Sequence, residues 1–373
     1  MGNAYVPGLK VLEHTTLHLE RRLPLKGRVE VRLGDRVTHD QIVARTELPG
    51  RVEMINVAAR LGIDAADVPA HMLCQSGDSV QQGQEIARSH GFFGLFKDSL
   101  TAPISGTLES VSSVSGQAVL RAPAHTVSIT AYVDGEVSEI LGDEGVIVTA
   151  GGALVQGIFG VGGESAGPLR CLASDPEAVL LPEQLLPEHR GCIVVGGSLV
   201  TLPVLRRAVE LGINGLVVGG IDDGVLRDFL GYDLGVAVTG SEDLGLTLII
   251  TEGFGPIAMA QRTFGLLKKH EGDLASISGA TQIRAGVIRP EIVIPCDAPA
   301  GEEGGGSAEP ELAVGTLVRL IREPHFGALA RVRSLPIDLA EIPTGAKVRV
   351  AEVELLDGSS LRIPRANLEI IAE

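Results

Sequence analysis

The sequence contains few aromatic residues and fewer basic residues than acidic ones. Of its 373 residues, three are Tyr, eight are Phe and none is Trp, and the 31 Lys and Arg are outnumbered by 47 Asp and Glu, which gives a net charge of −16. Proteins that wrap nucleic-acid backbones neutralise phosphates with Lys and Arg, and single-strand binders stack bases on aromatic rings. The composition therefore argues against nucleic-acid binding as the main activity. With 45% hydrophobic residues the chain is also too apolar to be disordered, and its length predicts two or three domains.

The chain also lacks a cysteine pattern. Its four cysteines are far apart and include no Cys-x-x-Cys pair: Cys74, Cys171, Cys192 and Cys296. A disulfide framework and a zinc knuckle both need characteristic cysteine spacings, and the nine histidines are equally scattered. We therefore predict no metal, no cofactor and a reducing, cytoplasmic location.

The residues after Met1 contain no apolar core of the kind found in signal peptides. One uncharged run further along the chain is long enough to be considered as a membrane span. It extends from 145 to 163, contains seven glycines among its 19 residues, and has acidic rather than basic neighbours. Membrane spans are predominantly apolar and are oriented by flanking Lys and Arg. We expect buried strands and tight turns here rather than a membrane span.

What the sequence does contain is an internal repeat. Residues 34–45 align without gaps on residues 77–88, with the same Gly, Asp, Val, Gln, Ala and Arg at six of twelve positions. In both copies Gly-Asp predicts a turn, and the alternating apolar residues that follow predict a strand. His39 occupies the position of Gln82 in the other copy, so we expect it to be a solvated turn residue and not a catalyst.

The second copy continues into a longer pattern. It reads Gly77-Asp78-x-Val80-x-x-Gly83-Gln84-x-Ile86-Ala87, followed by Thr101-Ala102-Pro103-Ile104-Ser105-Gly106-Thr107-Leu108. This pattern resembles the barrel-sandwich hybrid of biotinyl- and lipoyl-like domains, a fold that also occurs in membrane-fusion adaptors and in Rnf-type electron-transfer subunits. The resemblance implies that residues 1–145 form a duplicated barrel-sandwich hybrid with a hairpin insertion.

The insertion replaces the hairpin tip at which this family carries its attachment lysine. The family's tip reads Met-Lys-Met or Asp-Lys-Ala, whereas residues 90–98 contain only Lys97, in unrelated surroundings. We therefore predict no attached biotin or lipoate. The same loop contains a group of large apolar side chains, namely Phe92, Phe93, Leu95 and Phe96. Exposed side chains of this kind would bind a protein partner; the alternative is that the loop folds back into the core.

After a glycine-rich connection over residues 146–165, strands and helices alternate. Short apolar runs predict strands at 192–197, 216–220, 236–240 and 246–251. Helices are expected at 201–211, after Asp222 and near 257–269, with Thr201 and Asp222 as N-caps. This alternation predicts an α/β domain with a parallel sheet over residues 166–296.

Glycines and polar residues gather where these strands end. The candidate ligand-binding residues are Gly196, Gly197, Ser198, Gly219, Gly220, Asp222, Glu252 and Gly253. In open α/β sheets ligands bind at the carboxyl edge, where a backbone without side chains lets an anion approach. We predict a small anionic ligand here; the alternative is that the glycines only serve tight connections with positive φ.

The last part of the chain has a different texture. Residues 297–312 contain five acids and no base, which predicts a flexible acidic linker. The runs Gly315–Ile321, Pro324–Val332 and Leu361–Glu369, with a turn at Asp357-Gly358, resemble a KOW-type small β-barrel over residues 313–373. Such barrels bind RNA or protein. Four arginines would give this one a local basic face: Arg319, Arg322, Arg331 and Arg333. Because eight basic and eight acidic residues balance over 314–373, protein contact is favoured over RNA contact.

Together these observations predict a multidomain protein with α/β and all-β parts: a duplicated barrel-sandwich hybrid, a parallel-sheet α/β domain and a small C-terminal β-barrel. Two folds that often carry catalysis occur without their usual functional residues. We therefore expect a non-catalytic cytoplasmic adaptor that binds protein partners through its β modules. Two alternatives stay open. One is an enzyme or ligand-sensing subunit that binds a small anion at the strand ends, and the other is a transcription- or translation-associated factor that acts through its tail.

Overall fold

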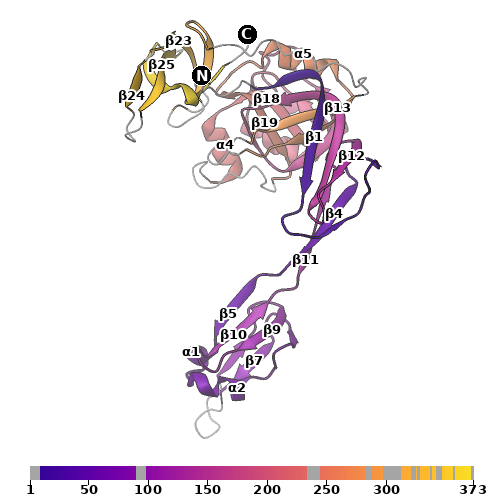
Figure 1. Cartoon of the computed structure of the whole chain (residues 1–373), viewed down its shortest axis with the longest axis vertical. Helices are drawn as coiled ribbons and strands as arrows, with labels where there is room; N and C mark the ends of the chain where they lie inside the picture. The colour runs from indigo at the N-terminus through magenta and orange to yellow at the C-terminus, as the bar shows by residue number, and fades with distance from the viewer. Residues whose placement is uncertain are drawn as a thin grey trace.

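The chain is mostly β, with few helices, and is divided among several sheets. The structure, a computed structural model, describes residues 9–89, 98–232, 244–281, 288–296, 312–320, 325, 328–336, 338–341, 347–355 and 358–370. Figure 1 shows a large central body, a lobe that projects from it towards the bottom of the view, and a small curled sheet beside the body at the upper left.

A mixed twelve-stranded sheet runs through the central body. Its order is β14-β19-β18-β16-β15-β20-β21-β13-β12-β3, with β1 paired to β13 and β17 paired to β18. The bounds are β1 Val11–Arg22, β3 Arg36–Val37, β12 Gly135–Ile140, β13 Gly145–Gln156, β14 Phe159–Val161, β15 Glu164–Cys171, β16 Ile193–Val195, β17 Leu199–Val200, β18 Gly215–Ile221, β19 Thr247–Phe254, β20 Leu274–Ser278 and β21 Glu291–Pro295.

The parallel sheet expected from the sequence is only one stretch of this mixed sheet. Strands β15, β16, β18 and β19 are parallel to one another. On either side of them the pairing changes, because β14 is antiparallel to β19 and β20 is antiparallel to β15. The sequence could not reveal these flanking pairs, because each joins segments that are far apart along the chain.

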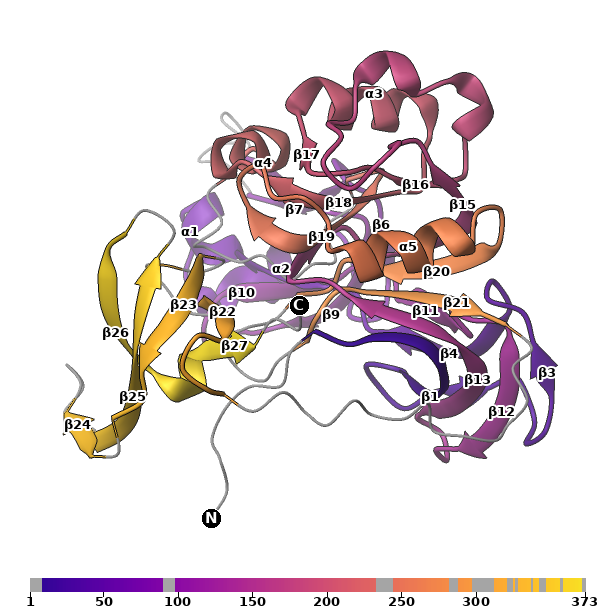
Figure 2. The same cartoon turned by 90° about the horizontal axis from the view of Figure 1, so that it is seen from above.

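Helices cover both faces of the parallel stretch (Figure 2). Helices α3 (Leu202–Leu211) and α4 (Asp223–Leu230) pack on one face, and α5 (Gln261–Lys269) packs on the other. Alternate residues of each strand supply the two cores: Val194 and Val218 pack towards α3 and α4, whereas Val195 and Val217 pack towards α5. Strands buried on both faces read as continuous apolar runs, as β18 does.

Most local predictions for residues 145–296 are confirmed. The uncharged run forms the long strand β13 and the short strand β14, so the segment expected as a connection is a buried part of the sheet. The strands near 192–197, 216–220 and 246–251 and the three helices are present. Thr201 and Asp222 occupy N-cap positions, although neither side chain makes a capping hydrogen bond. The expected strand at 236–240 lies outside the described residues.

Two strand connections join the body to the projecting lobe. On the body side, β11 (His125–Thr130), β4 (Ile42–Leu48) and β2 (Arg28–Val29) form a three-stranded sheet. Its chains then continue outward through a neck, defined here as residues 49–51 and 122–124 (Figure 1). The two backbones touch in the neck: a Cβ on Gly50 would lie 2.0 Å from the Ala122 carbonyl oxygen, so only glycine fits.

Residues 52–121 form the distal lobe. A four-stranded sheet has the order β5-β10-β9-β6, and a two-stranded sheet pairs β7 with β8. The bounds are β5 Val52–Asn56, α1 Val57–Leu61, η1 Ala65–Asp67, α2 Val68–His71, β6 Ser79–Val80, β7 Glu85–Arg88, β8 Ser99–Thr101, β9 Gly106–Val111 and β10 Gln117–Arg121. The lobe has its own hydrophobic core, which includes Leu108 and Leu120. The loop that contains Phe92, Phe93, Leu95 and Phe96 lies outside the described residues.

The two copies of the repeat have the same local geometry. In each, the Asp side chain accepts a hydrogen bond from the backbone N–H three residues earlier: Asp35 from Arg32 at 2.8 Å, and Asp78 from Gln75 at 2.7 Å. The preceding glycines both have positive φ, at 83° and 100°. The turn predicted from Gly-Asp is therefore confirmed in both copies. The copies lie in different cores, one in the body and one in the distal lobe.

The C-terminal sheet is a small, antiparallel, curled half-barrel with its own core. Its order is β24-β25-β23-β22-β27, with β26 paired to β25. The bounds are β22 Leu317–Leu320, β23 Leu329–Ser334, β24 Leu339–Glu341, β25 Lys347–Leu355, β26 Ser360–Pro364, η5 Arg365–Asn367 and β27 Leu368–Ile370. All of the expected acidic linker except Leu312 lies outside the described residues.

Candidate functional site at the carboxyl edge of the parallel strands

The first pair of candidate glycines lies against the chain's own backbone. A Cβ on Gly197 would lie 2.1 Å from the Ala178 carbonyl oxygen, and one on Gly196 would lie 2.9 Å from Val218. The next residue, Ser198, is tied to the same segment: its N–H donates to the Ala178 carbonyl at 2.9 Å and its hydroxyl donates to the Glu177 carbonyl at 2.7 Å. The segment 177–178 therefore occupies the space beside Gly197, and the Val218 side chain occupies the space beside Gly196.

The second pair has the same surroundings. A Cβ on Gly219 would lie 2.2 Å from the Ile257 carbonyl oxygen, and one on Gly220 would lie 2.0 Å from the Gly255 carbonyl oxygen. The segment after β19 thus folds back over the end of β18, and the Gly255 N–H donates to the Ile221 carbonyl at 2.9 Å.

Close approach of other parts of the chain, rather than positive φ, explains all four glycines: backbone approaches Gly197, Gly219 and Gly220, and the Val218 side chain approaches Gly196. None of them has a positive φ angle. The alternative that the glycines serve tight connections with positive φ is therefore wrong for these four, which instead lie against other parts of the chain. The anion site stays a prediction.

The topology of the parallel stretch offers no crevice of the usual kind. Ligands of open α/β sheets bind where the strand order reverses. Here β15, β16, β18 and β19 follow one another across the sheet in chain order. The connecting helices α3 and α4 accordingly lie on the same face of the sheet. In the described part of the chain, the order of these four strands therefore contains no reversal at which such a crevice would form.

The remaining candidates separate into two places. Asp222 lies beyond the end of β18 and is exposed at the start of α4. Glu252 and Gly253 are buried near the end of β19, where Gly253 is the pairing partner of Gly220. Of the predicted polar side chains, Glu252 is the one placed among other charges.

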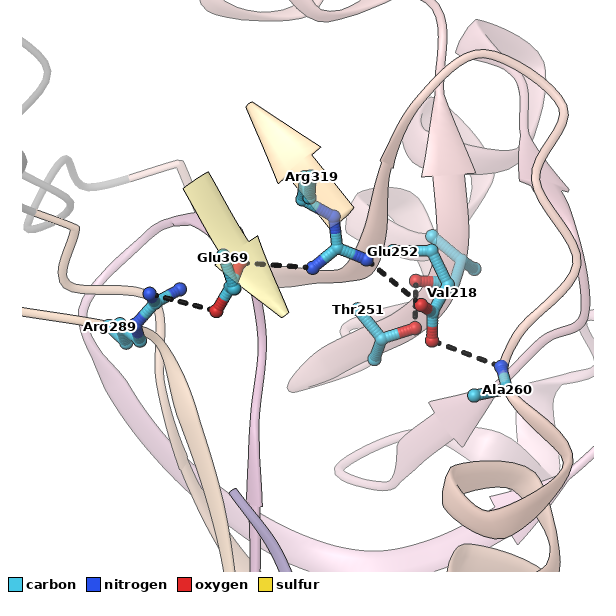
Figure 3. A network of polar contacts seen from close by, with 7 residues as sticks. All are labelled: Val218, Thr251, Glu252, Ala260, Arg289, Arg319 and Glu369. Carbon is cyan, nitrogen blue, oxygen red and sulfur yellow. Dashed lines mark hydrogen bonds and ion pairs between the residues drawn. The ribbon is translucent and has the colours of Figure 1, made fainter. Parts of the chain in front are cut away.

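Glu252 belongs to a buried network of alternating charges (Figure 3). Its Oε1 accepts a hydrogen bond from the Ala260 N–H at 3.0 Å, and its Oε2 accepts one from Arg319 Nη2 at 3.1 Å. Arg319 Nη1 donates in turn to Glu369 Oε2 at 3.4 Å. Arg289 Nη2 forms an ion pair with Glu369 Oε1 at 2.9 Å.

The network joins the C-terminal sheet to the central body. Arg319 comes from β22 and Glu369 from β27, whereas Glu252 comes from β19 and Arg289 from the segment before β21. The Arg319 side chain is only 2% exposed and that of Glu369 is fully buried. Two guanidinium groups and two carboxylates balance in charge, so the arrangement is closed and acts as a docking contact between modules.

Burial has a measurable electrostatic consequence in this network. Loss of hydration raises the pKa of Glu369, although Arg319 and Arg289 act in the opposite direction. Arg319 Nε is buried and makes no hydrogen bond within the described part of the chain. The contact is thus costly in desolvation and depends on every charged member being present.

Sequence reasoning found Glu252 but missed its partners. Arg319 was expected on an exposed basic face, and this expectation is wrong, because β22 is buried at Val318, Arg319 and Leu320 alike. Arg331 and Arg333 are both exposed, and Arg322 lies outside the described residues. The available signal was an arginine inside an apolar strand, where a buried cation needs an acidic partner.

Among the residues that the structure describes, no three His, Cys, Asp or Glu side chains gather closely enough to hold a metal ion. Within the same residues, no helix combines the length and the apolar character needed to cross a bilayer.

Comparisons with known proteins assign no family. No family model matches the chain, and no curated protein shows significant sequence similarity to it.

Proposed function

We propose that this chain is a non-catalytic adaptor that presents two β modules, the distal lobe and the C-terminal sheet, to protein partners. The observation that carries the proposal is the projection of the distal lobe away from the body on a two-strand neck (Figure 1). A lobe with its own core, attached in this way, leaves its outer surface accessible. Exposed apolar side chains that gather on such a surface mark an interaction site.

The edge strand β5 is the part of the lobe best suited to a protein partner. It ends the four-stranded sheet, so among the described residues it pairs only with β10. Its side chains Val52 and Met54 are 44% and 68% exposed. An open edge of this kind can pair with an extended segment of another protein, and adjacent apolar side chains give such pairing its selectivity. We take the partner to be a protein that supplies an extended, apolar segment.

The finer fold assignments belong to the same proposal. The equivalent Gly-Asp turns of the two repeats support a relationship of residues 1–145 to barrel-sandwich hybrids, whose relatives include adaptors. The antiparallel, curled shape of residues 313–373 supports a KOW-type module that contacts protein rather than RNA. Both assignments are inferences from these patterns.

Photo-crosslinking in the full-length chain tests the adaptor function. A photoreactive residue in place of Met54 should link to a protein, and the substitution Val52→Lys in the same chain should abolish that product. Val114→Lys is the matched control, because Val114 is 91% exposed in the same lobe but lies outside β5. Loss of the product in the control as well, or its persistence with Val52→Lys, would refute the edge-strand site.

Removal of the whole lobe gives a second test. Leu48 and His125 are direct cross-strand partners, so an Asn-Gly turn between them should close a hairpin in place of residues 49–124. The body should stay folded, because its core includes no residue of the lobe. We expect the lobe-dependent partners to be lost while those of the C-terminal sheet remain.

The ligand-sensing alternative has its own test. A small anion bound at the strand ends must raise the apparent stability of the parallel sheet. A thermal-shift series with nucleotides and small carboxylic acids that produces no stabilisation would exclude it.

A further inference from the structure

A pocket opens on the twelve-stranded sheet at a notch beside β13. On the same side of β13, β12 pairs up to Thr149 and β21 pairs from Gly152 onward, so a gap remains between these two strands. The pocket has a volume of about 450 Å³. Its polar lining includes Arg36, Asp134, Glu136, Thr149 and Cys296.

One of the residues that line this pocket, Cys296, has an imidazole beside its thiol. Cys296 Sγ lies 3.7 Å from His14 Nδ1. The two come from opposite sides of β13: His14 lies where the pairing of β1 with β13 shifts between Leu12 and Thr15, and Cys296 follows β21. Thr15 faces Gly152 in this register, and Gly152 lies so close to β21 that a Cβ there would be 2.4 Å from the Ile294 carbonyl oxygen. An imidazole at this distance can accept the thiol proton and leave a nucleophilic thiolate.

The other three cysteines have unreactive surroundings. Burial, together with the nearby Glu271 carboxylate, raises the pKa of the Cys171 thiol to about 12. Burial also raises the pKa of the Cys74 thiol. Cys192 is buried in the central body. Among the described contacts of the four thiols, the one with an imidazole belongs to Cys296, and a neighbouring imidazole can raise the thiolate fraction on which reactivity depends.

The pocket carries charges of both signs. Arg36 and Glu136 are direct partners on the paired strands β3 and β12. Asp134 accepts a hydrogen bond from the His39 N–H at 2.6 Å and lies 3.0 Å from His39 Nδ1. A guanidinium suits a carboxylate, and free carboxylate oxygens suit an ammonium group.

We propose that Cys296 and His14 form a reactive thiol site whose pocket takes small amino-acid disulfides, molecules that carry a carboxylate and an ammonium group beside a sulfur–sulfur bond. His14 accepts the Cys296 proton, and the thiolate attacks one sulfur of the disulfide. A bond forms between Sγ and that sulfur while the sulfur–sulfur bond breaks. The leaving thiolate takes the proton from His14. The disulfide is the oxidant, and the chain ends as a mixed disulfide at Cys296 with one thiol released.

Alkylation of the intact protein tests the thiol site. With iodoacetamide at about pH 7.5, Cys296 should react about tenfold faster than Cys74, as resolved by peptide mass spectrometry. His14→Gln should lower the rate at Cys296 about fivefold. His18→Gln is the matched control, because His18 is exposed on the same strand and bonds Thr149 instead. An unchanged rate at Cys74 in each variant confirms that the fold is intact. Equal rates at Cys296 and Cys74, or equal effects of the two histidine substitutions, would overturn the proposal.

A comparison of two disulfides tests the ligand class. Cystine, which carries both charges, should modify Cys296 faster than the neutral 2-hydroxyethyl disulfide. Arg36→Gln should remove most of this preference and leave the iodoacetamide rate at Cys296 unchanged, because the guanidinium binds the carboxylate and does not activate sulfur. Equal rates for the two disulfides in the parent protein would refute the amino-acid ligand.

Discussion

The distal lobe and the C-terminal sheet are both small β modules with their own cores, yet they are attached to the body in opposite ways. The lobe continues from strands of the body through the neck, and its ion pairs Glu85–Arg88 and Glu109–Arg121 lie within the lobe. The C-terminal sheet instead docks through the buried charges of Arg319 and Glu369. The stability of the lobe should therefore be local, whereas the placement of the C-terminal sheet should depend on a few buried groups.

The largest effect is expected from the docking charge. Arg319→Met leaves the carboxylates of Glu252 and Glu369 buried without the guanidinium between them. Removal of one member of a buried ion network costs about 3–5 kcal/mol, and the loss should appear as undocking of the C-terminal sheet. Urea unfolding and limited proteolysis between the modules measure it.

Arg333→Met is the control for that prediction. Arg333 pairs with Glu354 in the same sheet, but its side chain is 66% exposed. An exposed ion pair is worth about 1 kcal/mol or less. If the two substitutions had similar effects, the buried network would not be what holds the sheet in place.

The second largest effect concerns the independence of the distal lobe. Ile86 is fully buried in the core of the lobe. Ile86→Ala should cost about 2–5 kcal/mol, and amide hydrogen exchange should accelerate in β5, β9 and β10 but not in β18 or β22. Val43 occupies the matching repeat position in the body core, so Val43→Ala should accelerate exchange in β12 and β13 instead. Spread of the Ile86→Ala effect into β18 would show that the lobe and the body unfold together.

This comparison also shows which features could be predicted from the sequence. Repeats, turns and most strands and helices follow from local patterns, and Gly34-Asp35 and Gly77-Asp78 form the expected turns. Which hydrophobic core each copy of the repeat packs in depends on pairing between distant segments of the chain. For example, β1 and β13 join residues 11–22 to residues 145–155. No local pattern encodes that pairing, so the sequence predicted one duplicated unit where the copies belong to separate cores.

The candidate site was predictable in part for the same reason. Glu252 was identified from its position at a strand end, but its role depends on Arg319, which lies 67 residues away along the chain. The glycine pairs were correctly placed at the ends of β16 and β18. What fills the space beside them is backbone from residues 177–178 and 255–257 and, at Gly196, the Val218 side chain; glycine permits such an approach as readily as it permits a ligand.

A smaller effect should be equal in the lobe and in the body. Asp35→Ala and Asp78→Ala each remove the acceptor of one turn hydrogen bond. Each should lower the unfolding free energy of its own module by about 1 kcal/mol, since the local geometry is the same. Exchange rates of the Arg32 and Gln75 amides report the two turns directly. A clear inequality would show that tertiary context, and not the turn itself, sets the stability.

The smallest effect is a pH dependence of opposite sign in the two attached modules. Burial raises the pKa of Glu369, so its folded state binds a proton more tightly than its unfolded state, and its contribution to stability is lost as pH rises through the folded pKa. In the lobe, hydrogen bonds from Arg88 and Arg121 lower the pKa values of Glu85 and Glu109, so the contribution of these two carboxylates to stability is lost as pH falls.

Between about pH 7 and about pH 4.5, acidification should therefore favour the C-terminal sheet relative to the lobe. Two differences in urea midpoint test this. One is between the parent and Glu369→Gln, with unfolding monitored by amide exchange in β22. The other is between the parent and Glu85→Gln, with unfolding monitored by amide exchange in β7. Taken as parent minus variant, the first difference should increase as pH falls and the second should decrease, because each substitution removes one titrating group. If both differences changed in the same direction, the burial of Glu369 would not control the docking of the sheet.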